Sequence, residues 1–265
     1  MPQNLKIAYF VEPDSASLAR RAAQFLVEQA EQAVAARGRA RIAVSGGSTP
    51  RATFEALAER GEPWLERMPW DKLDLYWVDE RCVPPDHPES NYGMTREALL
   101  NWVPLKPEQI HRIEGELNPD EAAARYESEL RSSFGLKGAG KPRLDVVQLG
   151  IGADGHTASL FPHSGALRVR NRLVAANYVA GKGAWRITLT ATAINRARQV
   201  FFLASGAEKA LILNEVFEAA RDPERLPSQL IVPSNGILTL LLDEDAAALL
   251  PEPDAEGFGS LERTE

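Results

Sequence analysis

The sequence predicts an α/β protein with one largely parallel, twisted sheet and helices on both of its faces. Short apolar segments alternate along the chain with longer segments of helical periodicity. Such alternation is typical of parallel sheets, because a helix usually connects one parallel strand to the next. The 265 residues suffice for one large α/β domain or two small ones. Since neither a repeat nor a low-complexity linker divides them, we expect a single domain over residues 1–250.

Each predicted element rests on its local pattern. The strands are short apolar runs, and the helices have apolar residues at helical spacing, most clearly in the long amphipathic segment 17–38. The predicted strands are residues 5–10, 41–46, 73–79, 144–149, 172–179, 186–190, 199–205 and 237–243. The predicted helices are residues 17–38, 49–61, 94–102, 121–130 and 206–220.

Composition favours a cytoplasmic protein without membrane partners. The hydrophobic content of 44% is that of an ordinary globular chain. No apolar run approaches membrane-spanning length, and the first residues lack the pattern of a signal peptide. Cys82 is the single cysteine, so no internal disulfide can form. We expect a monomer or a weak dimer.

The net charge of −7 is unevenly distributed. Residues 251–265 are acidic and rich in Pro and Gly, and we expect them to form a mobile tail. Residues 155–207 contain seven basic residues and no Asp or Glu, so this part of the protein could attract an anion. Nucleic acid is not the expected anion, because the basic residues are not interleaved with aromatic ones and the whole domain is acidic.

Ligands of parallel α/β sheets bind where the strands end, so the loops after strands are the places to search. The first such loop is SGGSTPR, residues 45–51. Gly46 and Gly47 allow backbone N–H groups to turn inward, Thr49 suits a helix N-cap and Pro50 the first helical position. Glycines before a helix N-terminus can form an anion site. A plain strand-to-helix turn is an equally good interpretation of this loop.

The second loop, residues 77–94, follows an apolar strand with Asp79, Glu80 and Arg81. The guanidinium of Arg81 suits a phosphate group. An ion-paired strand end is the alternative, but the long Pro-rich loop exceeds what a connection needs and favours function. Cys82 is interpreted as a filler, because no partner histidine is near it in the sequence.

The third loop contains Gly150, Gly152 and Gly155 in the G-x-G-x-x-G spacing of dinucleotide loops. A dinucleotide site needs an acidic residue about twenty positions after the glycines. Here the first Asp or Glu after Gly155 is at residue 208. We therefore reject NAD. His156 could instead act as a general base, with Asp154 to orient or polarise a reacting group. The alternative is a histidine that caps the turn.

The fourth loop places Lys209 in the first turn of a helix, residues 206–220. A cation there opposes the helix dipole, which suggests a bound anion, although an exposed lysine could tolerate this small cost. Metal-binding spacings and the G-x-S-x-G serine motif are absent from the sequence. Hydrolysis would then proceed by direct attack of water.

Together these four loops resemble the 6-phosphogluconolactonases, which share a Rossmann-like, deaminase/isomerase-type fold. The resemblance runs over nearly the whole chain, from IAVSGGSTPR through WVDERCVPPDHPESNYGM and LGIGADGHTASLFP to FFLASGAEKA. The third motif is the specific one: in the related glucosamine-6-phosphate deaminases the residues after the histidine end in Asn-Glu-Pro, whereas here HTASLFP follows.

The resemblance implies hydrolysis of 6-phospho-D-glucono-1,5-lactone to 6-phosphogluconate in the oxidative pentose phosphate pathway, without metal or organic cofactor. It implies that His156 is the base that activates water, assisted by Asp154. The implied substrate contacts are Gly46, Gly47, Ser48, Thr49, Arg81, Gly152, Gly155, Arg186 and Lys209. Two alternatives stay open: a sugar-phosphate isomerase or deaminase on the same fold, and a sugar-phosphate sensor, which would need a DNA-binding helix-turn-helix.

Overall fold

The computed structural model describes residues 4–136 and 140–264. Its strands are β1 (Asn4–Glu12), β2 (Ala40–Val44), β3 (Leu73–Trp77), β4 (Asp79–Arg81), β5 (Ile110–His111), β6 (Val146–Leu149), β7 (Val174–Val179), β8 (Ala184–Leu189), β9 (Gln199–Ala204), β10 (Ile237–Asp243) and β11 (Phe258–Thr264). Its α-helices are α1 (Ser15–Arg37), α2 (Ser48–Ala58), α3 (Pro63–Arg67), α4 (Asn91–Thr95), α5 (Pro119–Ser133), α6 (Ala191–Ile194), α7 (Ala210–Phe217) and α8 (Glu244–Ala247).

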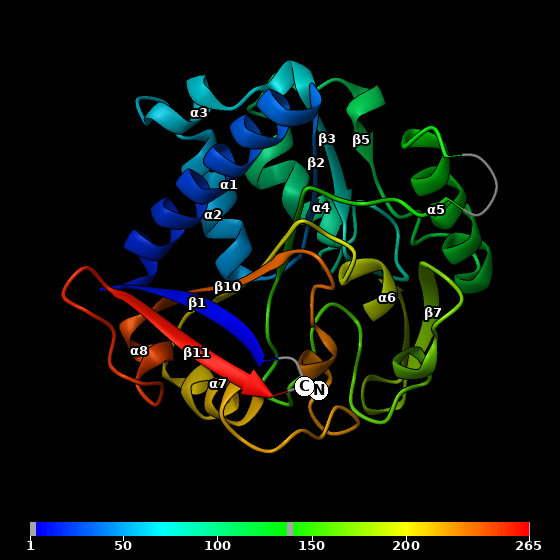
Figure 1. Cartoon of the computed structure of the whole chain (residues 1–265). Coiled ribbons are helices and arrows are strands. Elements are labelled where there is room, and N and C mark those ends of the chain that lie inside the picture. The colour runs from blue at the N-terminus through cyan, green and yellow to red at the C-terminus, as the bar shows by residue number, and fades with distance from the viewer. Residues whose placement is uncertain (1–3, 137–139, 265) are drawn as a thin grey trace.

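The structure confirms the α/β class and the largely parallel sheet (Figure 1). The central sheet has the strand order β11-β1-β10-β9-β6-β2-β3-β5. Its strands are parallel except β11, which pairs antiparallel with β1. Every residue of β9 is buried, as expected for a strand covered on both faces.

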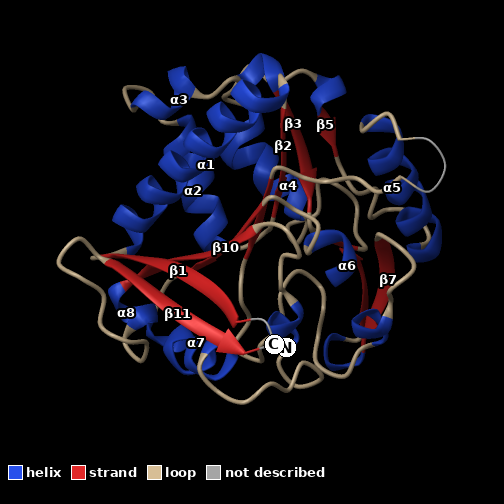
Figure 2. Ribbon diagram, in the orientation of Figure 1, coloured by secondary structure: helices blue, strands red, loops and turns tan. Residues whose placement is uncertain are grey.

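Two adjacent residues of β9 show that helices cover both faces of the sheet. Successive side chains of a strand point to opposite faces. The ring of Phe201 lies 5.1 Å from that of Phe25 in α1, and the ring of Phe202 lies 5.6 Å from that of Phe217 in α7. Helices α1 and α7 therefore pack on opposite sides of one strand, and Figure 2 shows helices around the central sheet.

The strand order places a ligand crevice between β2 and β6. From β2 the chain continues to β3 on one side, whereas from β6 it returns to β9 on the other. Such a reversal of direction between neighbouring strands opens a crevice at their carboxyl ends, which we call the carboxyl edge of the sheet. The glycine loops after β2 and after β6 both lie at this reversal.

Part of the topology differs from the expected single sheet. Strands β7 and β8 leave the central sheet and form a small antiparallel sheet with β4, in the order β4-β8-β7. The short strands β4, β5 and β11 were not predicted. The helix expected at residues 94–102 is instead α4 followed by a π-helical segment, Arg96–Leu100.

The acidic tail also differs from its prediction. Residues 258–264 form β11, which pairs with β1 at the edge of the sheet. The ring of Phe258 lies 5.4 Å from that of Phe10, and Leu261 is buried. Gly257, at a φ of 77°, makes the turn before the strand, and its carbonyl accepts a hydrogen bond from Val11. Residues 258–264 are thus attached to the edge of the sheet, although their composition predicts mobility.

None of the helices in the described parts of the chain is both long and apolar enough to cross a membrane.

Candidate active site

Loops after four neighbouring strands meet in one cavity at the carboxyl edge, with a volume of about 250 Å³. The strands β9, β6, β2 and β3 are adjacent in the sheet, which brings together loops far apart in the sequence. Six of the predicted site residues line the cavity: Gly46, Gly47, Arg81, Gly152, His156 and Lys209. Ser45, Asp79, Asn91, Gly150, Ile151 and Ala158 complete the lining.

His156 is held in one orientation by Asp154. The Asp154 carboxylate lies in hydrogen-bond contact with Nδ1 of the imidazole and also accepts the backbone N–H of His156 at 3.2 Å. On its face the imidazole stacks on Phe161, with 4.1 Å between ring centroids. Burial opposes the charged form of Asp154, but the hydrogen bond and charge of His156 outweigh it and hold the pKa of Asp154 below its ordinary value. Nε2 is the nitrogen left to act in the cavity.

The glycine turn after β6 brings His156 back to the strand end. The N–H of Gly152 donates to the carbonyl of His156 at 2.9 Å, and the N–H of Gly155 donates to the carbonyl of Gly152 at 2.9 Å. These two N–H groups are therefore committed to the turn and are not free for a ligand. A side chain at Gly152 would collide with the imidazole of His156 and with the carboxylate of Asp154.

The first loop presents the start of α2 to the cavity. Gly47 is the N-cap residue, with a φ of 119° that L side chains rarely adopt, and no described side chain caps the helix. The helix begins at Ser48, so the prediction of Thr49 as N-cap is wrong. The N–H groups of Ser48 and Thr49 donate to no described acceptor, and Gly47 just before them lines the cavity. Gly46 has no room for a side chain, because the amide of Asn91 packs against its Cα.

Three cations lie at or beside the cavity. Arg81 and Lys209 line it. Arg186 does not line it, but it pairs with Arg81 across β4 and β8, and such paired residues project to the same face. The Arg81 guanidinium donates to the carbonyl of Glu89. Within the described chain none of the three forms an ion pair with a carboxylate, so their charges remain available to an anionic substrate.

The long loop after β4 is ordered by Glu80. This buried carboxylate accepts the backbone N–H groups of Arg81, Asn91 and Tyr92 at 2.7–2.8 Å and the Ser90 hydroxyl at 3.1 Å. Burial raises the pKa of Glu80, although the backbone hydrogen bonds oppose this. Glu80 therefore holds the loop that carries Asn91 into the cavity.

The sequence prediction expected Asp79 to face the cleft but gave it no role, and it missed Asn91 as a residue of the site. One carboxylate oxygen of Asp79 accepts from the Ser159 hydroxyl at 2.7 Å, and the other from the Asn91 amide at 3.2 Å. Asp79 was noted as a polar residue at a strand end, but nothing in the sequence pairs it with Ser159, which lies eighty residues later. Ala158, another lining residue, has a φ of 48°, and such backbone strain is typical of functional sites.

Five predicted site residues do not line the cavity: Ser48, Thr49, Asp154, Gly155 and Arg186. Asp154 contacts Nδ1 of His156 and does not itself face the cavity. Gly155 faces away, since a side chain there would meet Leu226, and its φ of 79° explains why the turn needs glycine. Burial raises the pKa of the Cys82 thiol to about 11, so this thiol stays protonated at neutral pH, in keeping with a filler.

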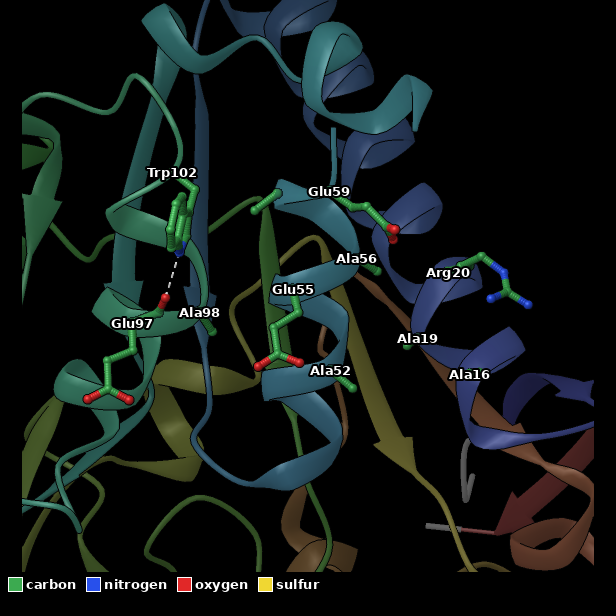
Figure 3. Close-up of a pocket in the computed structure, with 11 residues that line it drawn as sticks. Ala16, Ala19, Arg20, Ala52, Glu55, Ala56, Glu59, Glu97, Ala98 and Trp102 are labelled. Carbon is green, nitrogen blue, oxygen red and sulfur yellow. Dashed lines mark hydrogen bonds between the residues drawn. The ribbon is translucent and has the colours of Figure 1, made fainter. Parts of the chain in front are cut away.

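A larger hollow, of about 580 Å³, lies between α1, α2 and the segment Arg96–Leu100 (Figure 3). Alanines of α1 and α2 face it, and three carboxylates surround it, those of Glu55, Glu59 and Glu97. It contains none of the predicted site residues, and its carboxylates would repel an anionic sugar phosphate. In the described parts of the chain, no three His, Cys, Asp or Glu side chains come together as a metal site would require.

The family model for glucosamine-6-phosphate isomerases/6-phosphogluconolactonase matches residues 13–240. The chain belongs to this family. It is 42% identical over 239 residues to a 6-phosphogluconolactonase of a Nostoc species, covering 90% of this chain and 95% of the relative. It is 39% identical over 237 residues to the 6-phosphogluconolactonase of Homo sapiens, covering 87% of this chain and 89% of the relative.

Solved structures agree with this assignment. The 6-phosphogluconolactonase from Trypanosoma cruzi superposes with a TM-score of 0.82 at 30% identity, over 95% of this chain and 99% of that one. A monomeric glucosamine-6-phosphate deaminase superposes with a TM-score of 0.74 at 20% identity, over 91% of this chain and 99% of that one. The second likeness concerns the fold alone.

Proposed function

We propose that this protein is a 6-phosphogluconolactonase, which hydrolyses 6-phospho-D-glucono-1,5-lactone to 6-phospho-D-gluconate in the oxidative pentose phosphate pathway. The names of the similar proteins support the substrate. The observation that carries the proposal is the site itself: a histidine held by Asp154 shares one cavity with Arg81 and Lys209. A base for water and cations for a phosphate are what this reaction needs.

His156 is the general base in the proposed mechanism. With Nδ1 engaged by Asp154, Nε2 takes a proton from water as the hydroxide adds to the lactone carbonyl carbon C1. The resulting tetrahedral intermediate carries its negative charge on the former carbonyl oxygen. When it collapses, the bond between C1 and the ring oxygen breaks, and the ring oxygen takes the proton back from His156. Asp154 stabilises the transient imidazolium, as its lowered pKa suits.

Positive charge in the same cavity holds the substrate. Arg81 and Lys209 bind the phosphate as charge-assisted donors, with Arg186 adding charge from the neighbouring strand. Because the N–H groups of Gly152 and Gly155 are occupied, we assign oxyanion stabilisation to the backbone N–H of Gly47, which lines the cavity and donates to no described residue. Phosphate binding remote from C1 then positions the carbonyl against the water.

The proposed reaction uses no metal and no organic cofactor. A lactone is a reactive ester, and general-base assistance of about 10²–10⁴-fold suffices for useful acceleration. We also propose that the protein acts in the cytoplasm. We propose that it is a monomer or a weak dimer, and size-exclusion chromatography with light scattering would test this oligomeric state.

The deciding experiment is a pH-stat assay of acid release from freshly prepared 6-phosphogluconolactone. The wild type should accelerate release well above the spontaneous rate. His156→Gln should lose about 10²–10⁴-fold in kcat while it still binds 6-phosphogluconate. A variant with near-wild-type kcat would remove His156 from the chemistry.

The same assay separates the main alternative. A deaminase of this fold would release ammonia from glucosamine 6-phosphate and leave the lactone at its spontaneous rate. That outcome would overturn the proposal of lactonase activity and favour glucosamine-6-phosphate deaminase activity.

A further inference from the structure

A second cationic cavity lies at the opposite edge of the central sheet. It has a volume of about 480 Å³. Its polar and charged lining consists of Arg170, Thr192, Asn195, Arg196, Arg221 and Ser234, and none of the described lining residues is a carboxylate. The chain as a whole carries more Asp and Glu than Lys and Arg, by 37 to 30. A cavity whose described lining contains arginines and no acidic residue is therefore unexpected in this protein.

This cavity is separate from the active site. The segment with Thr192 and Arg196 directly precedes β9, and the segment with Ser234 directly precedes β10. The cavity thus lies at the amino ends of parallel strands, whereas the active site lies at their carboxyl ends. The six residues of β9 alone separate the two edges by about 20 Å, at roughly 3.3 Å per residue. A substrate phosphate in the active site cannot reach these arginines.

Two of the arginines have no carboxylate partner. Within the described chain, Arg170 donates only to the carbonyl of Leu167, at 2.8 Å, and Arg196 to the carbonyl of Pro142, at 3.4 Å. Three other arginines of residues 155–207 are ion-paired: Arg168 with Glu224, Arg172 with Glu127 and Arg198 with Asp145. Arg170 and Arg196 thus resemble Arg81 and Arg186 at the active site, which also form no ion pair with a described carboxylate. Unpaired guanidinium groups facing one cavity favour an anionic ligand.

The walls of the cavity are held in place before any ligand binds. The Asn195 side chain donates to the carbonyl of Leu230 at 2.7 Å and accepts the N–H of Val232 at 2.7 Å. The backbone carbonyl of Asn195 accepts the N–H of Ser234 at 2.9 Å. These bonds join the segments before β9 and β10 into one unit. A preorganised site loses less entropy when it binds its ligand.

One further cation, Arg143, lies beside the cavity. The Arg143 guanidinium donates to the carbonyls of Arg196 and Asn235, which fixes it beside the wall. The hydroxyls of Thr192 and Ser234 make no hydrogen bond to the described residues, so they can donate to a ligand.

We propose that this cavity, between the segments that precede β9 and β10, binds a phosphorylated small molecule of charge −2 or more. Arg170 and Arg196 supply the charge, and the Thr192 and Ser234 hydroxyls supply neutral donors to the phosphate oxygens. The volume exceeds that of the active-site cavity, at about 480 Å³ against about 250 Å³, and so leaves room for more than one phosphate group. The site is distinct from the catalytic one and would be occupied independently of it.

The test is isothermal titration of pyrophosphate into a protein whose active site is weakened by Arg81→Ala and Lys209→Ala. One binding event should remain. Adding Arg196→Ala or Arg170→Gln to this background should weaken it about tenfold or more, as expected for loss of one charge-assisted partner. Arg60→Ala is the matched control: it removes the same charge from an exposed residue, and should leave the affinity unchanged.

Two results would overturn the proposal: no binding in the active-site-weakened protein, or equal weakening by Arg60→Ala and Arg196→Ala. Thermal unfolding of each variant checks that the fold is intact, and Arg170→Gln serves as the milder second variant. In the otherwise wild-type protein, Arg196→Ala should leave kcat/KM for the lactone unchanged. If Arg196→Ala lowered kcat/KM and pyrophosphate affinity by the same factor, the substitution would have disturbed the fold rather than removed a ligand contact, and the proposal would fail.

Discussion

Gly152→Ala should displace the imidazole of His156, the proposed general base, without removing it from the site. The structure leaves no room for a side chain at this position: the new methyl would lie 2.7 Å from the Asp154 carboxylate and closer still to the imidazole of His156. Both neighbours are side chains, which can rotate away, so the turn should persist. The rotation, however, would separate the hydrogen-bonded pair of Asp154 and His156 on which the proposed mechanism depends.

The size of the effect follows from the displacement. Ordinary contacts of a methyl group begin near 3.4 Å, so the 2.7 Å approach to Asp154 alone requires a shift of about 0.7 Å. The imidazole, which is nearer, must move by on the order of 1 Å, and a misplacement of this size can cost about a hundredfold in rate. We therefore expect kcat to fall by about two orders of magnitude while the unfolding temperature changes little.

The assay compares Gly152→Ala with Gly150→Ala. Gly150 belongs to the same turn and lines the same cavity, but a side chain there meets nothing within 4 Å. Both methyl groups can crowd the substrate and raise KM, whereas only the one at residue 152 displaces the base. The imidazole resonances of His156 in NMR spectra should shift in Gly152→Ala alone. Equal kcat in the two variants, or unshifted resonances in Gly152→Ala, would refute the assigned role of this glycine.

Three further predictions follow from the site and the fold. Arg81→Ala and Lys209→Ala should each lower kcat/KM for the phosphorylated lactone by about ten- to a hundredfold, since a charge-assisted bond contributes roughly 1.5–3 kcal/mol; equal losses for unphosphorylated gluconolactone would contradict the phosphate assignment. Treatment with EDTA should leave activity intact, and a loss restored by zinc or magnesium would argue for a metal. Burial opposes protonation of His111, but its bonds to Asp74 and Glu129 outweigh this and raise the pKa of His111 above 6.5. Protonated His111 therefore stabilises the folded state fully below pH 6.5, and this contribution disappears as the pH rises through the folded pKa. His111→Gln should lower the free energy of unfolding in urea more at pH 5.5 than at pH 8.5. A loss of stability independent of pH would mean that His111 is not charged in the fold.

Much of the fold could be predicted because its central strands are buried on both faces and show as apolar runs. β9, β6 and β10 follow this pattern, and so does the long amphipathic α1. The parts that escaped prediction have no such signal. β4 is only three residues long and polar, Asp-Glu-Arg, and its identity as a strand depends on pairing with β8, more than a hundred residues later. Pairing of this kind is a tertiary property.

The candidate site was predictable where one loop carries its own chemistry. His156 and Asp154 are two residues apart, and the glycines around them mark the turn, so local sequence sufficed. Asn91 and Ser159 were missed because each acts through Asp79, to which only the folded chain brings them. Gly155 was assigned to the substrate from the same motif, yet it faces Leu226 on the far side of the turn. A motif identifies the loop, but the direction of each residue in it is set by the backbone.

The acid-free stretch of residues 155–207 illustrates why charge along a sequence does not locate a site. The stretch begins after β6 at the carboxyl edge, runs to the amino end of β9, and returns along β9 to the carboxyl edge. Its cations are therefore distributed over both edges of the sheet. Arg168, Arg172 and Arg198 are paired with acids from outside the stretch, Glu224, Glu127 and Asp145. Arg186 remains beside the active site, and Arg170 and Arg196 remain at the opposite edge. The sequence alone suggests one anion near this segment, whereas the fold places its unpaired arginines at two separate cavities, and each requires its own ligand to be tested.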